Sequence, residues 1–316
     1  LNEGVAQAAS IYVAFMREVG TIHAGFDSAE AIQAAIRKGA SYEPAQLSRG
    51  MIAYGAILAL QSPEFVQGVR TYAVDPAQRQ QMIARILADP AAAATFPGAD
   101  AAAGLIVDTI GRDSAAMMAI AETVEEDAYT IQGRGDPRRR WATVHISDRV
   151  TRLEGAKSLS AVQMLPSAEE SARLFAAANS GSGLGVGPAR SGPPYTPAVI
   201  RSLAVAALAA LGAGGDDARA NTEALTVEQN SEFCLNMSKL MLFQCLAASR
   251  PSYEDMFCVG RHVARDLATC TAQNITPAPL DVPQTAVAGG APEQTPIAAE
   301  AAAASTAATT ALNDSR

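Results

Sequence analysis

The chain has 316 residues, enough for one large domain or two small ones, and a formal net charge of −8. A negative balance of this size argues against general binding to nucleic acids or anionic membranes, which requires a basic surface. Hydrophobic residues make up 49% of the chain but aromatic residues only 5%, and much of the rest of the apolar content is alanine. This composition favours close-packed helices over a β-sandwich.

Helix-start signals recur along the chain. A capping side chain followed by proline occurs at Ser62, Asp75, Asp89, Asp136 and Thr196. Capping boxes are predicted at three further sites: Ser167 with Glu170, Thr226 with Gln229, and Ser252 with Asp255. Between these starts the apolar residues recur with a helical period, and no run alternates as a strand would. The sequence therefore predicts an all-α fold, built as an irregular multi-helix bundle.

An acidic cluster lies in one of the predicted helices. Glu122 and Glu126 are one turn apart and share a face, and Glu125 and Asp127 lie beside them. Paired carboxylates can bind metal or act as acid–base groups. No Glu-x-x-His motif or second acidic motif accompanies this cluster. We interpret it as a solvated helix face and keep Glu122 and Glu126 as weak candidates for a catalytic or metal-binding pair.

A basic and aromatic patch follows at Arg138, Arg139, Arg140 and Trp141. Such a patch could bind a carboxylate, a phosphate or a glycan. Asp136 lies just before the patch, and the acidic cluster is close in sequence. We therefore favour an internal ion-pair cluster and keep the four residues as a weak candidate site.

The neighbours His145, Ser147 and Asp148 contain the residue types of a hydrolase triad. Triads assemble from distant segments, with the serine on a sharp turn, and no Gly-x-Ser-x-Gly motif is present. We interpret His145 with Arg149, and Asp148 with Arg152, as neighbours one helical turn apart. The sequence assigns no catalytic residue, no metal ligand and no cofactor-binding residue, and we expect the protein not to be an enzyme.

Changes in composition divide the whole chain into four predicted regions. Residues 1–178 are predicted to form an N-terminal helical domain and residues 179–195 a Gly/Pro-rich linker, whose glycines lack the spacing of a phosphate-binding loop. Residues 196–273 are predicted to form a C-terminal helical region. Residues 274–316 contain Ala, Pro and Thr with few large apolar side chains, which predicts a disordered tail.

Four cysteines occur in two matched pairs. Ten residues separate Cys234 from Cys245, and eleven separate Cys258 from Cys270. Such steps rise about 16–18 Å along an α-helix, whereas a disulfide needs Cα atoms about 4.4–6.8 Å apart. An antiparallel hairpin turning at Arg250-Pro251-Ser252 brings Cys245 to Cys258 and Cys234 to Cys270. We therefore predict a helical hairpin held by two disulfides.

Metal binding is the main alternative for this region. Structural zinc sites use closely spaced ligand pairs, although a partial site of Cys245, Cys258 and His262 is conceivable, as are free or intermolecular thiols. Met237 and Met241 lie one turn apart and could bind copper. We interpret the two methionines as core packing.

The paired cysteines indicate an oxidising compartment. No apolar run reaches the length of a membrane span, and the chain begins at Leu1, which agrees with removal of a signal peptide. We expect a periplasmic or secreted protein, with a structural or protein-interaction role in a bacterial envelope and another envelope protein as its partner. The alternatives are an envelope hydrolase using a helix-borne carboxylate and a binder of an apolar small molecule or lipid.

Overall fold

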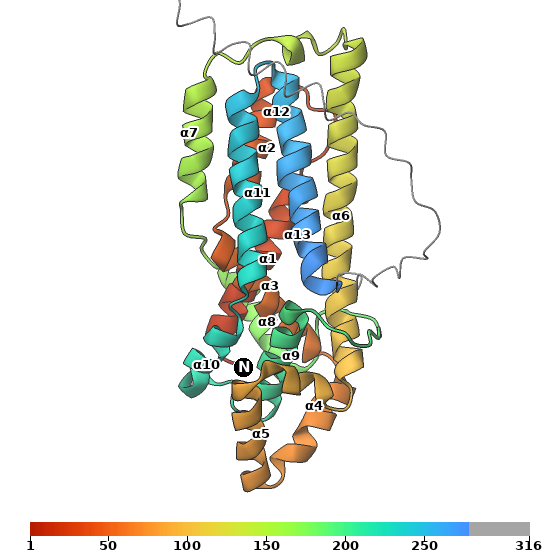
Figure 1. The fold of residues 1–316 in the computed structure, drawn as a ribbon, viewed down its shortest axis with the longest axis vertical. Helices are drawn as coiled ribbons and strands as arrows, with labels where there is room; N and C mark the ends of the chain where they lie inside the picture. The colour runs from red at the N-terminus through yellow and green to blue at the C-terminus, as the bar shows by residue number, and fades with distance from the viewer. Residues whose placement is uncertain (278–316) are drawn as a thin grey trace, which may run out of the picture. The chain divides into compact units, whose positions relative to one another are not determined.

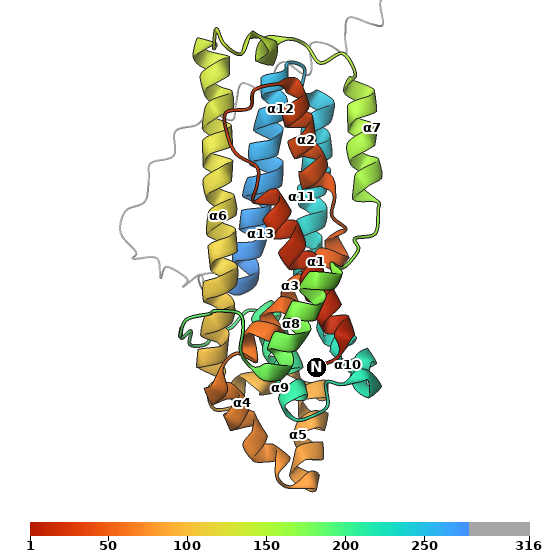
Figure 2. The same cartoon turned by 180° about the vertical axis from the view of Figure 1, so that it is seen from behind.

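The computed structural model describes residues 1–277, and helices account for their regular secondary structure (Figures 1 and 2). The predicted all-α class is therefore confirmed for this part of the chain. The α-helices are α1 (Glu3–Val19), α2 (Ala29–Ala40), α3 (Pro44–Ala59), α4 (Pro63–Arg70), α5 (Pro76–Ala88), α6 (Ala99–Arg134), α7 (Arg149–Ser160), α8 (Ala168–Ser180), α9 (Pro197–Ala210), α10 (Arg219–Leu225), α11 (Gln229–Ala248), α12 (Ser252–Val259) and α13 (Asp266–Ile275).

Five short helical segments complete these elements. Four are 3-10 helices, and the fifth, η5, is a π-helical segment between α12 and α13. Their bounds are η1 (Thr71–Ala73), η2 (Pro90–Thr95), η3 (Arg140–Thr143), η4 (Asp216–Ala218) and η5 (Gly260–Arg265).

Most predicted helix starts occur where the capping side chains indicate. Ser62, Asp75 and Thr196 each accept a hydrogen bond from a backbone N–H in the first turn, directly before a proline. Three predictions were wrong. Asp136 is followed by a single turn and not by a helix, although its side chain accepts a hydrogen bond from the Arg138 N–H. Glu228 instead of Thr226 caps α11, because its carboxylate reaches the N–H groups of the first turn. Ser252 is the first residue of α12 rather than its cap, and no side chain caps that helix.

One hydrophobic core runs through the described residues. Helix α3 packs against both α1 and α9, and α6 packs against α13 and η5. The fully buried aliphatic residues of the core come from both sides of the predicted linker, for example Ile57 in α3 and Leu203 in α9. Residues 1–277 therefore belong to one packing unit, and the predicted N-terminal and C-terminal regions are not separate bodies.

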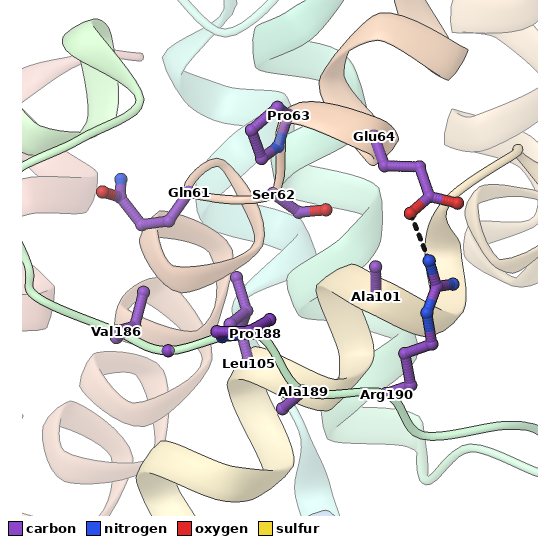
Figure 3. A pocket seen from close by; sticks show the side chains of 11 residues that line it. Gln61, Ser62, Pro63, Glu64, Ala101, Leu105, Val186, Pro188, Ala189 and Arg190 are labelled. Atoms are coloured by element: carbon purple, nitrogen blue, oxygen red, sulfur yellow. Dashed lines mark hydrogen bonds and ion pairs between the residues drawn. The ribbon is translucent and has the colours of Figure 1, made fainter.

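The Gly/Pro-rich segment 179–195 is fixed against the helices at its C-terminal half. Arg190 forms an ion pair with Glu64, shown in Figure 3, and a second one with Asp100. The N–H of Ser191 donates to the Asp100 carbonyl. The backbone of this segment passes so close to α6 that a Cβ at Gly104 would lie 2.3 Å from the Ala189 carbonyl carbon. The C-terminal half of this predicted Gly/Pro-rich linker is therefore attached to α4 and α6, because ion pairs hold it and a glycine in α6 allows close packing.

The C-terminal hairpin has the predicted geometry. Helix α11 runs antiparallel to a second arm made of α12, η5 and α13, shown in blue in Figure 1. Cys234–Cys270 and Cys245–Cys258 are both disulfides with Cα atoms 5.7 Å apart, which confirms the pairing predicted from the spacing.

The π-helical segment explains why the two cysteine spacings differ by one residue. Eleven residues make about three turns of an α-helix, so Cys234 and Cys245 face the same side of α11. The second arm has one residue more between Cys258 and Cys270, and η5 lies between them. A π turn is wider and takes up the extra residue. Both second-arm cysteines therefore still face α11.

The predicted start of the tail at residue 274 was placed too early. Asn274 and Ile275 belong to α13 and are buried. The Asn274 side chain donates to the Ser231 hydroxyl, and the Thr196 hydroxyl donates to the Asn274 carbonyl. These hydrogen bonds fix the last turn of α13, which follows Cys270. The predicted disordered tail otherwise falls in residues 278–316, which lie outside the described residues.

Removing each disulfide tests how the hairpin is stabilised. The Cys234–Cys270 bridge closes a sequence separation of 36, and the Cys245–Cys258 bridge one of 13. From the loop entropy of the unfolded chain we expect a loss of about 4 kcal/mol for paired Cys→Ser changes at the first and about 3 kcal/mol at the second. Denaturant unfolding of the two double variants measures this. A larger loss for the shorter loop would contradict the entropic account.

Candidate interaction surface

Helix α11 carries large apolar side chains on its exposed side. Phe233 is 67% exposed, Leu240 46%, and Met237 and Met241 39% each. They recur at positions three, four and seven apart, so they form one stripe along the helix. The prediction that Met237 and Met241 are core residues was wrong, because the core side of α11 is occupied by other side chains.

The exposed face of α11 is also free of charge. Its other members are polar amides and small residues, Asn236, Gln244, Ala247 and Ala248, and the amides Gln229 and Asn230 are exposed at the start of the helix. The helix contains two charged residues, Glu232, which is half-buried, and Lys239, which is buried. A 20-residue helix with no exposed charge is unusual in a chain of which 18% is charged. We call these eight exposed residues, Phe233, Asn236, Met237, Leu240, Met241, Gln244, Ala247 and Ala248, the α11 face.

The opposite side of α11 is apolar as well. Leu235, Leu242 and Leu246 are buried against the bundle, and the two disulfides join the helix to the second arm at both ends. Sequence periodicity did not reveal the α11 face because apolar residues occupy both sides of the helix. Core packing and cross-links therefore hold α11, and its outer side chains are not needed for that packing.

Lys239 anchors the middle of α11. Its ammonium group donates to the carbonyl oxygens of Tyr42 and Ser160, the second at 2.9 Å, and lies 4.3 Å from the centre of the Tyr42 ring. The Tyr42 hydroxyl in turn donates to the Leu235 carbonyl at 3.1 Å. Lys239 therefore ties α11 to the ends of α2 and α7, and burial lowers the pKa of Lys239 to about 8.

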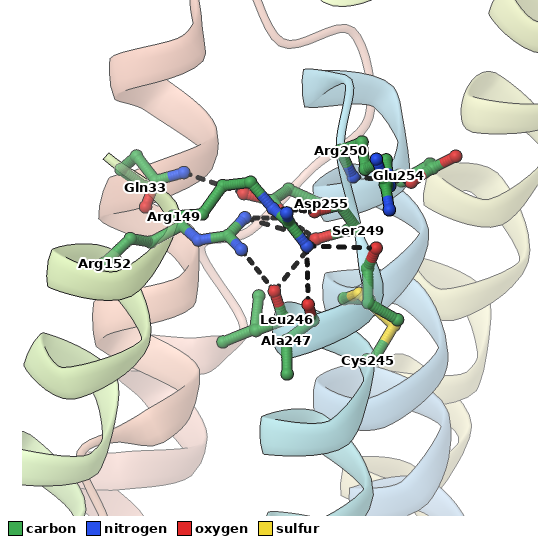
Figure 4. Close-up of polar contacts among 12 residues, drawn as sticks. Gln33, Arg149, Arg152, Cys245, Leu246, Ala247, Ser249, Arg250, Glu254 and Asp255 are labelled. Carbon is green, nitrogen blue, oxygen red and sulfur yellow. Dashed lines mark hydrogen bonds and ion pairs between the residues drawn. A yellow bond between two sulfur atoms is a disulfide. The ribbon is translucent and has the colours of Figure 1, made fainter. Parts of the chain in front are cut away.

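A buried polar network holds the turn of the hairpin (Figure 4). The guanidinium of Arg152 in α7 forms an ion pair with the fully buried Asp255 of α12 and donates to the Leu246 carbonyl. Asp255 also accepts hydrogen bonds from the Ser249 hydroxyl at 2.6 Å and from the Gln33 side chain at 2.9 Å. Arg152 thus neutralises the Asp255 carboxylate, and hydrogen bonds from protein groups replace its water. The turn between α11 and α12 therefore has a fixed geometry.

The segment before α7 differs from its prediction. Helix α7 begins at Arg149, so His145 lies outside it in a loop, where the N–H of Ile146 donates to the Arg250 carbonyl at 2.8 Å. Arg149 donates to the carbonyls of Ala247 and Ser249 rather than contacting His145. The expectation of helical neighbours was therefore wrong for His145 and Arg149, because Arg149 caps the C-terminal end of α11. It was correct for Asp148 and Arg152, since the Arg152 N–H donates to the Asp148 carbonyl at 2.9 Å in the first turn of α7.

A groove of about 730 Å³ lies between α2 and α7. Apolar side chains from both helices line it, including Ile36 and Leu159, and Trp141 and Ile146 of the segment before α7 also line it. His145, Ser147 and Asp148 also line this groove, so the three residues are brought together in one loop. No serine elbow or oxyanion arrangement accompanies them.

The structure separates the four residues of the acidic cluster. Glu122 and Glu126 are exposed on α6. Glu125 forms a two-pronged ion pair with Arg265 of η5 at 2.7 and 3.0 Å, and Asp127 pairs with Arg139. The two inner carboxylates therefore attach α6 to its neighbours, and none of the four lines a described cavity.

Arg139 is the centre of the basic patch. Its guanidinium donates two hydrogen bonds to Asp127, at 2.6 and 2.7 Å, and one to Asp136 at 2.8 Å. These hydrogen bonds hold the pKa of Asp127 below its usual value. Arg138 and Arg140 are exposed, and Trp141 turns into the groove, so the patch does not form one basic site.

One carboxylic acid within residues 1–277 has a raised pKa, and no motif in the sequence indicates it. Burial raises the pKa of Asp113, which accepts a hydrogen bond from the Tyr12 hydroxyl at 3.1 Å. The cavity beside Asp113 has about 230 Å³ and contains no second carboxylate or histidine. A paired acid–base site is therefore not formed there.

A second cavity of about 500 Å³ lies where the segment 186–190 crosses α6, beside the start of α4 (Figure 3). The two charged residues that line it, Glu64 and Arg190, pair with each other. In the part of the chain that the structure describes, no three His, Cys, Asp or Glu side chains are placed to hold a metal ion. His262 contacts Asp266 at 3.0 Å, and all four cysteine sulfurs are in disulfides.

No known protein family, curated protein or solved structure matches this chain. Among the described helices, none combines the length and the apolar character that a membrane span requires. The two disulfides indicate an oxidising, non-cytoplasmic location. The α11 face, the groove between α2 and α7 and the small Asp113 cavity are the surface features from which a function can be argued.

The buried ammonium of Lys239 makes a pH-dependent contribution to stability. Its folded pKa of about 8 lies below the value of 10.5 for a free lysine. Below pH 8 Lys239 is protonated in both the folded and the unfolded chain, so folding must remove water from its ammonium group. Between pH 8 and 10 the unfolded chain binds more protons, so stability rises with pH. We expect the unfolding free energy of the wild type, relative to Lys239→Met, to rise by about 2 kcal/mol between about pH 7.5 and 9.5.

Urea unfolding at the two pH values measures this difference. Lys157→Met is the matched control, because the Lys157 side chain is 45% exposed and its replacement should leave the pH dependence unchanged. Parallel pH profiles for the wild type and Lys239→Met would show that the buried ammonium does not titrate in this range.

Proposed function

We propose that the protein is an exported, non-enzymatic interaction component of a bacterial envelope, in the periplasm or secreted, and that it docks another protein through the α11 face. The observation that carries this proposal is the absence of exposed charge along a helix with four large exposed apolar side chains. Contiguous apolar surface of this kind is typical of protein interaction sites. The two disulfides support the proposed compartment.

The chemistry of the face restricts what can bind it. A charged partner side chain placed over Leu240 or Met241 would lose its water without gaining an ion pair, which is costly. The partner should therefore present an uncharged, apolar helix face of similar length. Methionine side chains adapt to irregular surfaces, and Asn236 and Gln244 supply hydrogen bonds that can fix the register.

The rigidity of α11 supports the same proposal. Both ends of the helix are cross-linked to the second arm, and Lys239 fixes its middle. A surface that is already ordered loses little conformational entropy on binding. The α11 face is therefore preorganised for a partner, because the disulfides and Lys239 hold the helix in place and its exposed side chains do not contribute to that.

Photo-crosslinking in the native cells tests the docking proposal. We expect a photoreactive residue at Met237 to form a discrete adduct, and the same residue at Val74, which is 85% exposed in the segment before α5, to form none. Leu240→Glu should abolish the adduct and the biological role together. Equal labelling from both positions, or a functional Leu240→Glu variant that folds normally, would contradict docking through α11.

The same assay separates docking from the hydrolase alternative. Glu122→Gln with Glu126→Gln should retain the biological role, and stability should change by less than about 1 kcal/mol because both carboxylates are exposed. If this variant folds normally but fails to complement the loss of the protein, a carboxylate-dependent activity replaces docking as the leading function.

A second candidate function is binding of a single-chain lipid in the groove between α2 and α7. Its volume of about 730 Å³ and largely apolar lining suit a small apolar ligand. Glu30 and Arg37 are both exposed at its edge and line it. Opposite charges on one rim favour a zwitterionic head group over a simple anion or cation.

The groove offers its own probe and a matched pair of variants. Trp141 lines it and is the single tryptophan of the chain. A Cβ at Gly155 in its wall, or at Gly133 in α6, would meet no atom within 4 Å. Gly155→Leu should therefore fill the groove without disturbing the helices, and Gly133→Leu serves as the control.

We expect a lysophosphatidylcholine with a short acyl chain to change the Trp141 fluorescence saturably. The affinity should fall by at least about tenfold in Gly155→Leu and stay unchanged in Gly133→Leu. No saturable change in the wild type, or equal affinity in the two variants, would exclude lipid binding in this groove.

A further inference from the structure

We propose that the partner of the α11 face is α11 of a second copy of this chain, packed antiparallel about a twofold axis near Leu240 and Met241. This inference rests on the proposed docking function and names its partner. The order of side chains along the α11 face supports this inference, because the face is complementary to a second copy of itself that runs in the opposite direction.

The arrangement of side-chain sizes indicates the direction of the second helix. Phe233 lies near one end of the face, and the small residues Ala247 and Ala248 lie at the other. Reversal about the centre places Phe233 of each copy over these two alanines of the other copy. A parallel pair would place Phe233 against itself and alanine against alanine, so bulk would collide at one end and a gap would open at the other.

The central positions give the same result. Reversal places Leu240 against Met241 of the second copy and Met237 against Gln244. The methionine stem then covers the aliphatic part of the glutamine, and the glutamine amide can form a hydrogen bond with Asn236 of the second copy. Side chains of similar volume thus meet at the centre, and a large side chain meets small ones at each end, so the summed volume stays even along the contact. The contacts are the same on both copies, as in an isologous interface.

Charge favours a second copy at this face over other parts of the surface. The chain has a net charge of −8, so two copies repel each other, and the repulsion is strongest where acidic side chains approach. The α11 face has no charged member. Two such faces meet without unpaired buried charges, and the helix, about 30 Å long, provides an extended contact.

Sedimentation equilibrium of the full-length, oxidised protein tests the association. We expect a dimer at micromolar concentration. Leu240→Glu should raise the dimer dissociation constant by at least about 100-fold, because two unpaired carboxylates would be buried at the axis. Leu87→Glu on α5 is the matched control, since Leu87 is 39% exposed, and it should leave the dimer intact.

A charge pair tests the antiparallel direction. Met237→Lys and Gln244→Glu should each weaken the dimer. Both changes in one chain should restore it, because the introduced ammonium of each copy then faces the introduced carboxylate of the other; within one helix the two positions are two turns apart. If the double variant dissociates further, the helices pair in parallel or elsewhere, and the proposed register is wrong.

The adduct formed at Met237 distinguishes failure of this inference from failure of the proposed function. An adduct of twice the chain mass, together with a dimer in sedimentation, supports the second copy. A monomer in sedimentation with an adduct of another mass overturns the second copy but leaves docking through α11 intact. A monomer that gives no adduct overturns both.

Discussion

The two cross-links between α11 and the second arm are the constraint on which the described structure depends. They hold α11 at both ends, Cys234 to Cys270 and Cys245 to Cys258. The inner side of α11 then buries leucines against the bundle, and the second arm packs along α6. The orientation of α11 is thereby set by covalent bonds and core packing. This frees its outer side from any role in folding, so residues there can be apolar without being buried.

The charged groups around the hairpin are placed so that they do not reach that outer side. Lys239 points inward to two carbonyl oxygens and an aromatic ring, and Arg152 and Asp255 neutralise each other beneath the turn. Buried charges of this kind cost desolvation energy unless polar partners surround them. Here they connect α11 to α2 and α7. The same groups that fix the helix in place therefore leave its exposed face without charge, which is the property from which we infer docking.

The candidate catalytic features lack the geometry that chemistry requires. Glu122 and Glu126 are exposed without a partner, and Arg139 is engaged by two carboxylates. Asp113 has the buried environment of a working acid, but its side-chain hydrogen bond goes to a tyrosine and no second carboxylate or histidine lines its cavity. Acid–base catalysis needs groups within hydrogen-bonding reach of a bound substrate. The groove between α2 and α7 has space for a ligand, and its lining suits binding better than reaction.

The sequence by itself determined the helical class, most helix starts and the disulfide pairing, because caps act locally and the cysteine spacing allows one hairpin geometry. It did not reveal that η5 absorbs the additional residue between Cys258 and Cys270, although the unequal spacing was a signal of it. Nor could it distinguish the two apolar sides of α11 or the ion pairs that fix Arg190. Tertiary structure decided these points, because burial depends on which distant elements cover a helix. Periodicity reports only that a side chain is apolar.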